Sequence, residues 1–180
     1  MFLASRKLVK VATNPRSTSA KTPATTSQTA HALDPKKLDF LNALIKEFPD
    51  FSWHFGNRFK FKAPKTIEID ENCPYPLPYF ALLTLHELGH ALSKHKDYNI
   101  DVERLKIESE AWQRAKSLIK NHPKWQKTYQ ISWNEDFAEN ELDSYRDWLH
   151  QKSKCKTCGL TMYQTPDKIY HCPQCDLLKS

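Results

Sequence analysis

Two histidines one helical turn apart, with a glutamate directly after the first, are the residues of this chain best suited to metal chemistry. They lie in the segment His86-Glu87-Leu88-Gly89-His90. On a helix, residues four apart project from one face, so both imidazoles can reach one zinc ion at about 2.0–2.1 Å. Glu87 is rotated by about 100° from His86 and can approach a zinc-bound water without binding the metal. Because zinc lowers the pKa of that water towards about 7, we expect Glu87 to accept its proton as a general base.

A third protein ligand is expected, because catalytic zinc sites usually have three and keep one position open. The next predicted helix contains Glu108-Ser109-Glu110-Ala111-Trp112. The two glutamates are about 200° apart on a helix, so at most one faces the metal. We favour Glu110, because the small Ala111 directly after it would permit close helix contact. Glu108 is the first alternative, and His95 and His122 are the others.

A second metal site is predicted at the C-terminal end of the chain, where four cysteines form two Cys-x-x-Cys pairs: Cys155, Cys158, Cys172 and Cys175. Each pair can hold two corners of a zinc tetrahedron, and a segment this short could hardly fold without metal. Four thiolates leave no open position, so the role expected of this zinc is structural. The fifth cysteine, Cys73, lies in a proline-rich loop and is expected to be an inert thiol, with a zinc-binding latch as the alternative.

These motifs resemble those of the zincin metallopeptidases of the glutamate-ligand (gluzincin) branch. The resemblance rests on His86-Glu87-Leu88-Gly89-His90 followed by Glu110-Ala111, covers about residues 35–125, and among short chains is greatest to the ImmA/IrrE-type peptidases. It implies that His86, His90 and Glu110 bind zinc and that Glu87 is the general base. SprT-like proteases are the runner-up, since they also pair this motif with a C-terminal ribbon, but they use a later histidine as third ligand.

The chain departs from the thermolysin-like pattern four residues after Glu110, where Arg114 replaces an aspartate. Support for a ligand histidine must therefore come from elsewhere. The candidates for this support are Asp70, Glu108 and Asp97. No residue of the motif stabilises an oxyanion, and the candidates for that role are Tyr98, His122 and Tyr129.

Hydrophobic periodicity predicts the elements that must position these residues. Asp34 can cap a helix that starts at Pro35 and ends at Pro49. Two alternating runs around Gly56-Asn57 predict a β-hairpin, and Thr66–Asp70 a third strand that lines the cleft as an edge strand. Further helices are predicted over 79–94, 101–120 and 135–151, and Leu160–Tyr163 with Lys168–Tyr170 as a small hairpin. Gly89, inside the metal-binding helix, is expected to allow another element to approach closely.

This order of elements predicts an α+β fold with three parts. We expect residues 1–33 to be a disordered basic leader, 34–151 a zincin-like metallopeptidase domain and 152–180 a C-terminal zinc ribbon. The leader has five basic residues and no acidic one, so the remaining chain is nearly neutral despite a net charge of +6. That charge distribution argues against a nucleic-acid-binding body. The sequence contains no run of about 18 apolar residues, so no membrane span is expected.

The predicted function is that of a zinc metallopeptidase, a hydrolase that binds one catalytic and one structural zinc ion and cleaves a protein or peptide substrate. The alternatives are a SprT-like protease of DNA-associated proteins, and a non-catalytic module whose ribbon binds DNA or a protein. The cysteines occur in pairs and no secretory signal is seen, so we expect them to bind metal rather than form disulfides. For the same reason we expect a cytoplasmic location. The Ser/Thr-rich, acid-free leader also fits an organellar transit peptide.

Overall fold

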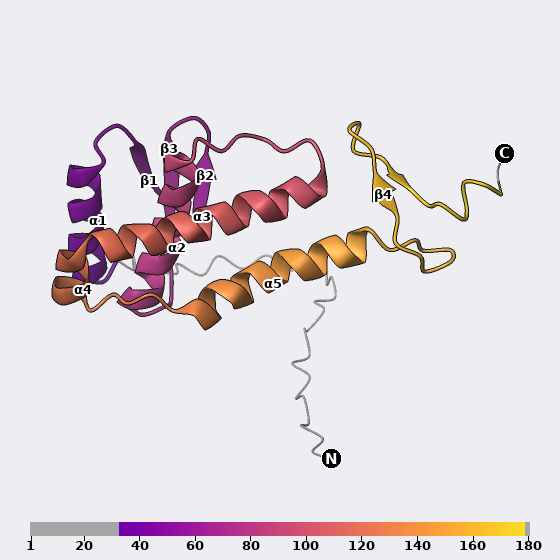
Figure 1. Ribbon diagram of the computed structural model, residues 1–180. Helices are drawn as coiled ribbons and strands as arrows, with labels where there is room; N and C mark the ends of the chain where they lie inside the picture. Colours follow the sequence, from indigo (N-terminus) through magenta and orange to yellow (C-terminus); the bar gives the residue numbers. More distant parts are fainter. Residues whose placement is uncertain (1–32, 179–180) are drawn as a thin grey trace, which may run out of the picture. The chain divides into compact units, whose positions relative to one another are not determined.

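The computed structural model describes residues 33–178 (Figure 1). The basic leader, and with it the expectation of a transit peptide, lies almost wholly outside the described residues. Among those residues the protein has a mixed α+β fold with five helices and two small sheets. The elements in chain order are α1 (Pro35–Glu47), β1 (Ser52–Gly56), β2 (Lys60–Lys62), β3 (Thr66–Asp70), α2 (Leu77–Leu92), α3 (Asp101–Asn121), α4 (Pro123–Tyr129), α5 (Glu135–Lys152), β4 (Tyr163–Gln164) and β5 (Tyr170–His171).

Helix α1 begins as its sequence predicts. The Asp34 side chain accepts a hydrogen bond from the backbone amide of Lys36 at 2.7 Å, and Pro35 occupies the first turn. The buried face of the helix consists of Phe40, Leu41 and Leu44, and it packs against α2. Burial of this apolar stripe stabilises a helix that would be marginal in isolation.

The three-stranded sheet has the order β1-β3-β2, so the predicted hairpin between the two alternating runs is wrong. Strand β1 pairs parallel with β3, and β2 pairs antiparallel with β3. The cause is burial: Ile67 and Ile69 of β3 are fully buried, whereas β1 and β2 are largely exposed or half-buried. The most apolar strand therefore takes the centre, and β2, not the predicted Thr66–Asp70, is the edge strand next to the site described below.

Helix α2 is buried on nearly every side, because it packs against the sheet, α1 and α3 at once. A helix that is apolar all round is stable only inside such a core. Its fully buried side chains include Phe80, Leu82, Leu85 and Leu88. The two motif histidines therefore project from a helix whose position is fixed by its neighbours.

Helices α2 and α3 approach each other closely at Gly89. A Cβ atom at this position would lie 2.4 Å from the backbone oxygen of Ala111. Only a residue without a side chain fits there, which confirms the expectation of a close approach at Gly89. The small side chain of Ala111, which is fully buried, makes up the other half of this contact.

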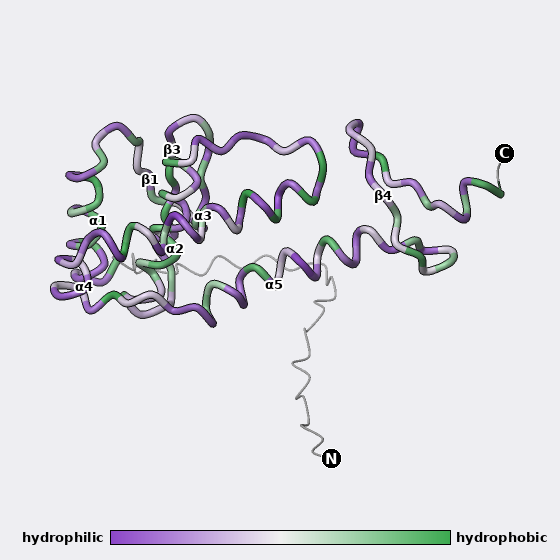
Figure 2. Tube along the Cα trace, viewed as in Figure 1, coloured by the Kyte–Doolittle hydropathy of each residue, from purple (hydrophilic) through white to green (hydrophobic). Residues whose placement is uncertain are grey.

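Helix α5 packs against α3 and leads into the C-terminal segment (Figure 1). Its first turn is capped by the Asn134 side chain, which accepts a hydrogen bond from the Phe137 amide at 2.9 Å. In Figure 2 the helix is mainly hydrophilic, with hydrophobic residues recurring along it, and its buried positions are Ala138 and Leu142. The short strands β4 and β5 pair antiparallel, and each begins and ends one to three residues later than the corresponding arm of the predicted hairpin.

One helix was not predicted. The short α4 follows α3 directly and buries Trp125 against the ring of Phe40, with the two ring centroids 6.1 Å apart. Over residues 33–178, no helix combines the length and the apolar character needed to cross a membrane.

Candidate metal centres

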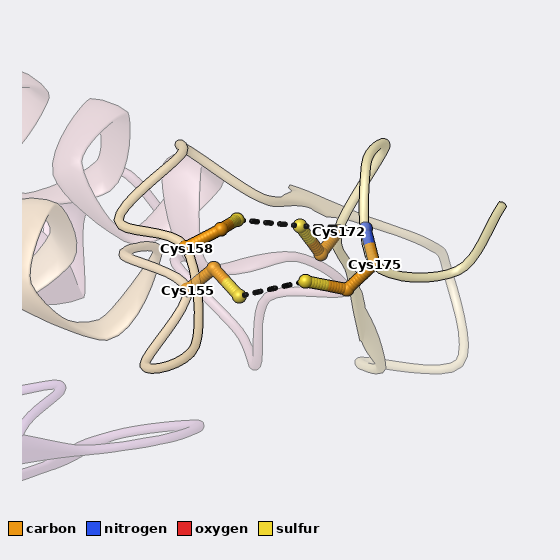
Figure 3. Close-up of side chains that lie close together, drawn as sticks. All are labelled: Cys155, Cys158, Cys172 and Cys175. Carbon is orange, nitrogen blue, oxygen red and sulfur yellow. Dashed lines mark hydrogen bonds between the residues drawn. The ribbon is translucent and has the colours of Figure 1, made fainter. Parts of the chain in front are cut away.

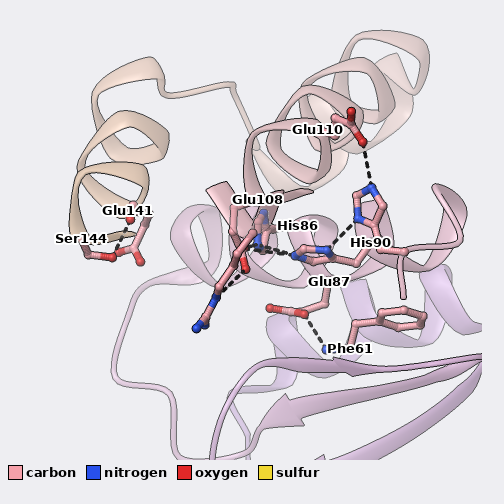
Figure 4. A network of polar contacts seen from close by, with 10 residues as sticks. Phe61, His86, Glu87, His90, Glu108, Glu110, Glu141 and Ser144 are labelled. Carbon is pink, nitrogen blue, oxygen red and sulfur yellow. Dashed lines mark hydrogen bonds and ion pairs between the residues drawn. The ribbon is translucent and has the colours of Figure 1, made fainter. Parts of the chain in front are cut away.

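Helix α2 directs the two motif histidines to one point. His86 and His90 are both buried, and their Nε2 atoms lie 3.1 Å apart (Figure 4). The ring of His86 packs on the indole of Trp112, with centroids 4.2 Å apart, and the ring of His90 lies parallel to Phe61. Each imidazole is thus confined by an aromatic side chain from a neighbouring element, α3 in one case and β2 in the other.

The carboxylate that joins the two histidines is that of Glu108, and the preference for Glu110 is corrected. Glu108 Oε2 lies 3.1 Å from His86 Nε2 and 3.3 Å from His90 Nε2. Glu110 Oε2 instead lies 3.1 Å from His95 Nε2. Burial opposes ionisation of Glu108, but its contacts with His86 and His90 outweigh this effect and lower its pKa to about 2.

Helix geometry explains why the sequence-based choice between the two glutamates failed. Ala111 does make the close contact with α2, as expected. Residues three or four apart share a helix face, so the glutamate on the same face as Ala111 and Trp112 is Glu108. Glu110, adjacent in sequence to Ala111, is rotated by about 100° away from that contact. The sequence did contain the signal for Glu108, which is its spacing of three residues from Ala111. The adjacency of Glu110 and Ala111 was not informative.

The three atoms fit a zinc ion by type and by spacing. Two imidazole nitrogens and a carboxylate oxygen form a common zinc ligand set. At ligand distances of about 2.0–2.1 Å, the edge of a regular tetrahedron is about 3.3 Å. The observed separations of 3.1, 3.1 and 3.3 Å are close to that edge. Arg104 Nε lies 3.8 Å from the other oxygen of Glu108, so the carboxylate is held from both sides.

Glu87 lies beside this cluster and is not one of its members. Its Oε2 atom accepts a hydrogen bond of 2.6 Å from the backbone amide of Phe61 in β2 (Figure 4). Burial raises the pKa of Glu87, although His86, His90 and the Phe61 amide act in the opposite direction. The carboxylate is therefore fixed in position and more basic than an exposed glutamate.

A cleft of about 600 Å³ opens onto these residues. Its wall combines residues of β2, of α2 and the segment after it, and of α3 and α5. Among them are Phe61, Glu87, His90, Tyr98, Glu108 and Tyr145. Of the proposed oxyanion-stabilising residues, only Tyr98 lines the cleft. His122 pairs with Glu47 and stacks on Trp125, and Tyr129 packs on Phe40, so neither belongs to the site. Sequence reasoning missed Tyr145, because nothing local marks which face of α5 meets the cleft.

Two residues form an outer layer behind His90. Its Nδ1 atom lies 2.9 Å from Nδ1 of His95, whose other nitrogen contacts Glu110. The residues behind His90 are thus His95 and Glu110, and the expected Asp70, Glu108 and Asp97 are not among them. His86 differs, because among the described residues its buried Nδ1 has no hydrogen-bond partner.

The four C-terminal cysteines form the second candidate centre (Figure 3). Their sulfur atoms lie within 4.8 Å of one another, with 3.8 Å between Cys155 and Cys175 and 3.4 Å between Cys158 and Cys172. All four are free thiols. A zinc tetrahedron with sulfur ligands at about 2.3 Å has an edge of about 3.8 Å, so the spacing fits this ion. The amides of Cys158 and Thr157 lower the pKa of Cys155 to about 6, which favours the thiolate form.

Cys73 belongs to neither cluster among the described residues. Its side chain is buried, and burial raises the pKa of its thiol. A buried thiol of raised pKa is inert, which agrees with the expectation for this cysteine and leaves the latch without support.

The C-terminal segment contacts α3 through Asp101, at the first position of that helix. Asp101 is only 3% exposed, and its carboxylate pairs with Lys152 at 2.6 Å and accepts a hydrogen bond from the Tyr170 hydroxyl at 2.8 Å. The Asp101 amide donates to Gln164 Oε1 at 2.6 Å. The helix that carries Glu108 is therefore joined at its start to the hairpin between the two cysteine pairs.

Comparisons of the chain with protein-family models, with curated proteins and with solved structures found no significant match.

Proposed function

We propose that this protein is a zinc-dependent metallopeptidase, a hydrolase of peptide bonds, whose catalytic zinc is bound by His86, His90 and Glu108. The observation that carries the proposal is the convergence of His86 Nε2, His90 Nε2 and Glu108 Oε2 beside the carboxylate of Glu87. The ligand types are those of the gluzincin resemblance, two histidines and one glutamate, and only the choice of glutamate differs.

When bound, the zinc ion supplies Lewis acidity, which makes a water molecule acidic and polarises a carbonyl group. Glu87 acts as the general base. Because its Oε2 is engaged by the Phe61 amide, Oε1 is the oxygen that accepts a proton from the attacking water. As the new C–O bond forms and the C–N bond breaks, Glu87 returns this proton to the leaving amine.

The edge strand β2 is the proposed binding surface for the backbone of the substrate. Lys60 and Lys62 flank Phe61, which is paired in register with Ile67 of β3. The amide of Phe61 donates to Glu87, so the outer edge of β2 faces the catalytic residues. An extended peptide can add to such an edge as a further strand, with its scissile bond near Glu87.

The four cysteines are proposed to hold a second, structural zinc ion in a ribbon. A complete shell of thiolates leaves no position for water, so this ion stabilises the segment and takes no part in hydrolysis. The SprT-like alternative gains no support at its distinguishing residue, because His122 lies with Glu47 and Trp125. The non-catalytic binding module remains as an alternative outcome of the experiment below.

The metal assignment is tested by zinc content, measured by mass spectrometry of purified, dialysed protein. Wild type is expected to contain two zinc ions per chain, and Glu87→Gln the same number. Glu108→Ala and Cys172→Ser should each contain one, because each removes one ligand from a different centre. One zinc ion in wild type, lost only in Cys172→Ser, would show that the histidine cluster does not bind zinc.

The activity is tested on a peptide library prepared from a digested proteome, by counting new amino termini. Wild type should produce such termini. Glu87→Gln should do so at least about 100-fold more slowly, since general-base catalysis contributes about that much or more. Equal cleavage by the two proteins contradicts the role of Glu87. Two bound zinc ions without any cleavage would favour the binding module.

A further inference from the structure

A series of polar contacts connects the surface of α3 to the Nδ1 atom of His90 (Figure 4). Glu110 Oε2 lies 3.1 Å from His95 Nε2, and His95 Nδ1 lies 2.9 Å from His90 Nδ1. The His95 side chain is 9% exposed, whereas that of Glu110 is 44% exposed. These contacts thus connect the solvent-accessible carboxylate of Glu110 to the buried ring of His90, whose Nε2 atom belongs to the metal cluster.

The contacts allow only one arrangement of protons once His90 binds a metal. A ligand nitrogen carries no proton, so His90 must keep its single ring proton on Nδ1 when Nε2 is the ligand. That Nδ1–H donates to His95 Nδ1, which must then be the unprotonated nitrogen of a neutral ring. His95 Nε2 carries its proton and donates to Glu110 Oε2. Each residue fixes the tautomer of the next, starting from the carboxylate, which can only accept.

The termination of α2 explains why His95 reaches His90. Lys94 adopts the left-handed conformation, with φ of 55°, and its amide donates to Ala91 O at 3.1 Å. The amide of His95 donates to His90 O, also at 3.1 Å. These two bonds are those of a Schellman motif, which usually has glycine at the left-handed position. Residues other than glycine are disfavoured in this conformation, so the turn that returns His95 to His90 is maintained against the local preference of Lys94.

The two histidine ligands are supported in different ways. His90 has a hydrogen-bond acceptor behind it, whereas His86 Nδ1 has none among the described residues and its ring rests on Trp112. A hydrogen bond selects one tautomer and one ring orientation, but contact with an indole restrains the ring without selecting the tautomer. Loss of the outer contact should therefore affect binding through His90.

We infer that His95 and Glu110 are positioning residues, which hold His90 in the orientation and tautomer that bind zinc. The inference rests on the zinc site of the proposed function, but it does not depend on peptide cleavage. It assigns a role to Glu110, the glutamate that the sequence favoured as a ligand. This role is indirect, because Glu110 acts on His90 through His95. It also assigns a role to His95, which touches a ligand and no metal-facing atom.

The test measures the zinc dissociation constant of the histidine cluster by competition with a chromophoric chelator. His95→Leu removes the acceptor and keeps a side chain of similar bulk. His95→Gln keeps an oxygen that can accept from His90 Nδ1. Glu110→Gln keeps an acceptor for His95 without the charge. Lys106→Ala is the matched control, because the Lys106 side chain is 76% exposed and its Nζ lies 3.8 Å from Oε1 of Glu110, the oxygen that does not face His95.

We expect His95→Leu to bind zinc 10- to 100-fold more weakly, in the range of outer-layer substitutions at metal sites. His95→Gln should recover most of this loss, Glu110→Gln should weaken binding by less than 10-fold, and Lys106→Ala should change it by less than twofold. The absorption of bound cobalt at the histidine cluster should change in His95→Leu and return in His95→Gln. The urea midpoint and the zinc of the cysteine cluster report on folding in each variant.

Two results would overturn the inference. The first is an affinity of His95→Leu within twofold of wild type. The second is an equal loss of affinity in His95→Leu and His95→Gln with an equal loss of stability, because that pattern indicates packing alone. Since zinc affinity is measured without substrate, failure of this inference is separate from failure of the peptidase proposal, which rests on Glu87→Gln.

Discussion

The polar groups around the proposed catalytic zinc come from three different elements. Glu87 is contributed by α2, the Phe61 amide by β2 and the Tyr145 hydroxyl by α5, and all three line the same cleft. Burial, together with the charge of Glu108, raises the pKa of Tyr145 to about 12, so the phenol keeps its proton at any working pH. The Arg104 guanidinium lies 4.9 Å from the centre of this ring and holds it in place.

Tyr145→Phe is therefore expected to slow peptide hydrolysis with little effect on metal binding. A hydroxyl donor that contacts the oxygen on which negative charge develops contributes about 100-fold to the rate of acyl transfer. We expect a loss of kcat/KM on that order, measured with a peptide identified from the library. The variant should still contain two zinc ions and unfold at the wild-type urea midpoint. An unchanged rate would remove Tyr145 from the reaction, and lost zinc would make its role structural.

At the scale of elements, the distance between α2 and α3 determines whether a metal site exists. Two ligands lie on α2 and the third on α3, and the helices meet at Gly89 and Ala111. Cores are close-packed, so an extra methyl group at such a contact is accommodated by moving a backbone. Any such movement also moves Glu108, which lies three residues before Ala111 on the same helix face.

Gly89→Ala should for this reason impair both stability and zinc binding. The added Cβ would lie 2.4 Å from Ala111 O, a backbone atom that cannot rotate away. We expect a loss of about 1–3 kcal/mol in the free energy of unfolding, measured in urea, and a zinc content that falls from two towards one.

Gly56→Ala is the matched comparison for this substitution. Its Cβ would also meet an atom at 2.4 Å, but that atom is the carboxylate oxygen of Glu68, whose side chain can turn aside. Gly56→Ala should retain both zinc ions and lose less stability than Gly89→Ala. If the two substitutions behave alike, the contact between Gly89 and Ala111 is not what positions Glu108.

At the scale of the whole described chain, Asp101 joins the cysteine segment to the helix that carries Glu108. Burial opposes ionisation of this carboxylate, but its contacts with Lys152, Tyr170 and Gln164 outweigh that effect and lower its pKa. It is therefore charged at neutral pH, and it satisfies groups from α5 and from the β4–β5 hairpin together. Lys168, in the turn of that hairpin, lies 5.2 Å from the ring of Tyr98 in the cleft wall.

Asp101→Asn is expected to loosen the cysteine segment while leaving both metal centres loaded. Asparagine keeps the size of the side chain but removes the charge that pairs with Lys152. A hydrogen bond to a charged group contributes about 2 kcal/mol to stability. Loss of this stability corresponds to roughly 30-fold faster hydrogen exchange, which we expect in residues 163–171. Asp143→Asn, which removes an exposed charge paired with Arg146, is the control and should leave exchange unchanged. Equal exchange in Asp101→Asn and wild type would show that Asp101 does not hold the hairpin.

Local sequence determined those features that depend on spacing within one element. The helix cap at Asp34, the shared face of His86 and His90 and the spacing within each Cys-x-x-Cys pair all follow from rules that act over a few residues. The mixed α+β character and the ranges of the long helices could be predicted for the same reason, because hydrophobic periodicity is a local signal.

Features that depend on which faces meet were decided by the tertiary structure alone. Periodicity shows that β1, β2 and β3 are strands, but not that β3 lies between the other two, because strand order depends on burial against α2. Whether Glu108 or Glu110 faces His86 depends on the rotation of α3 about its axis, which is set by the contact between Gly89 and Ala111. The residues that support His90 and line the cleft come from separate elements, and sequence separation carries no information about their distance in space.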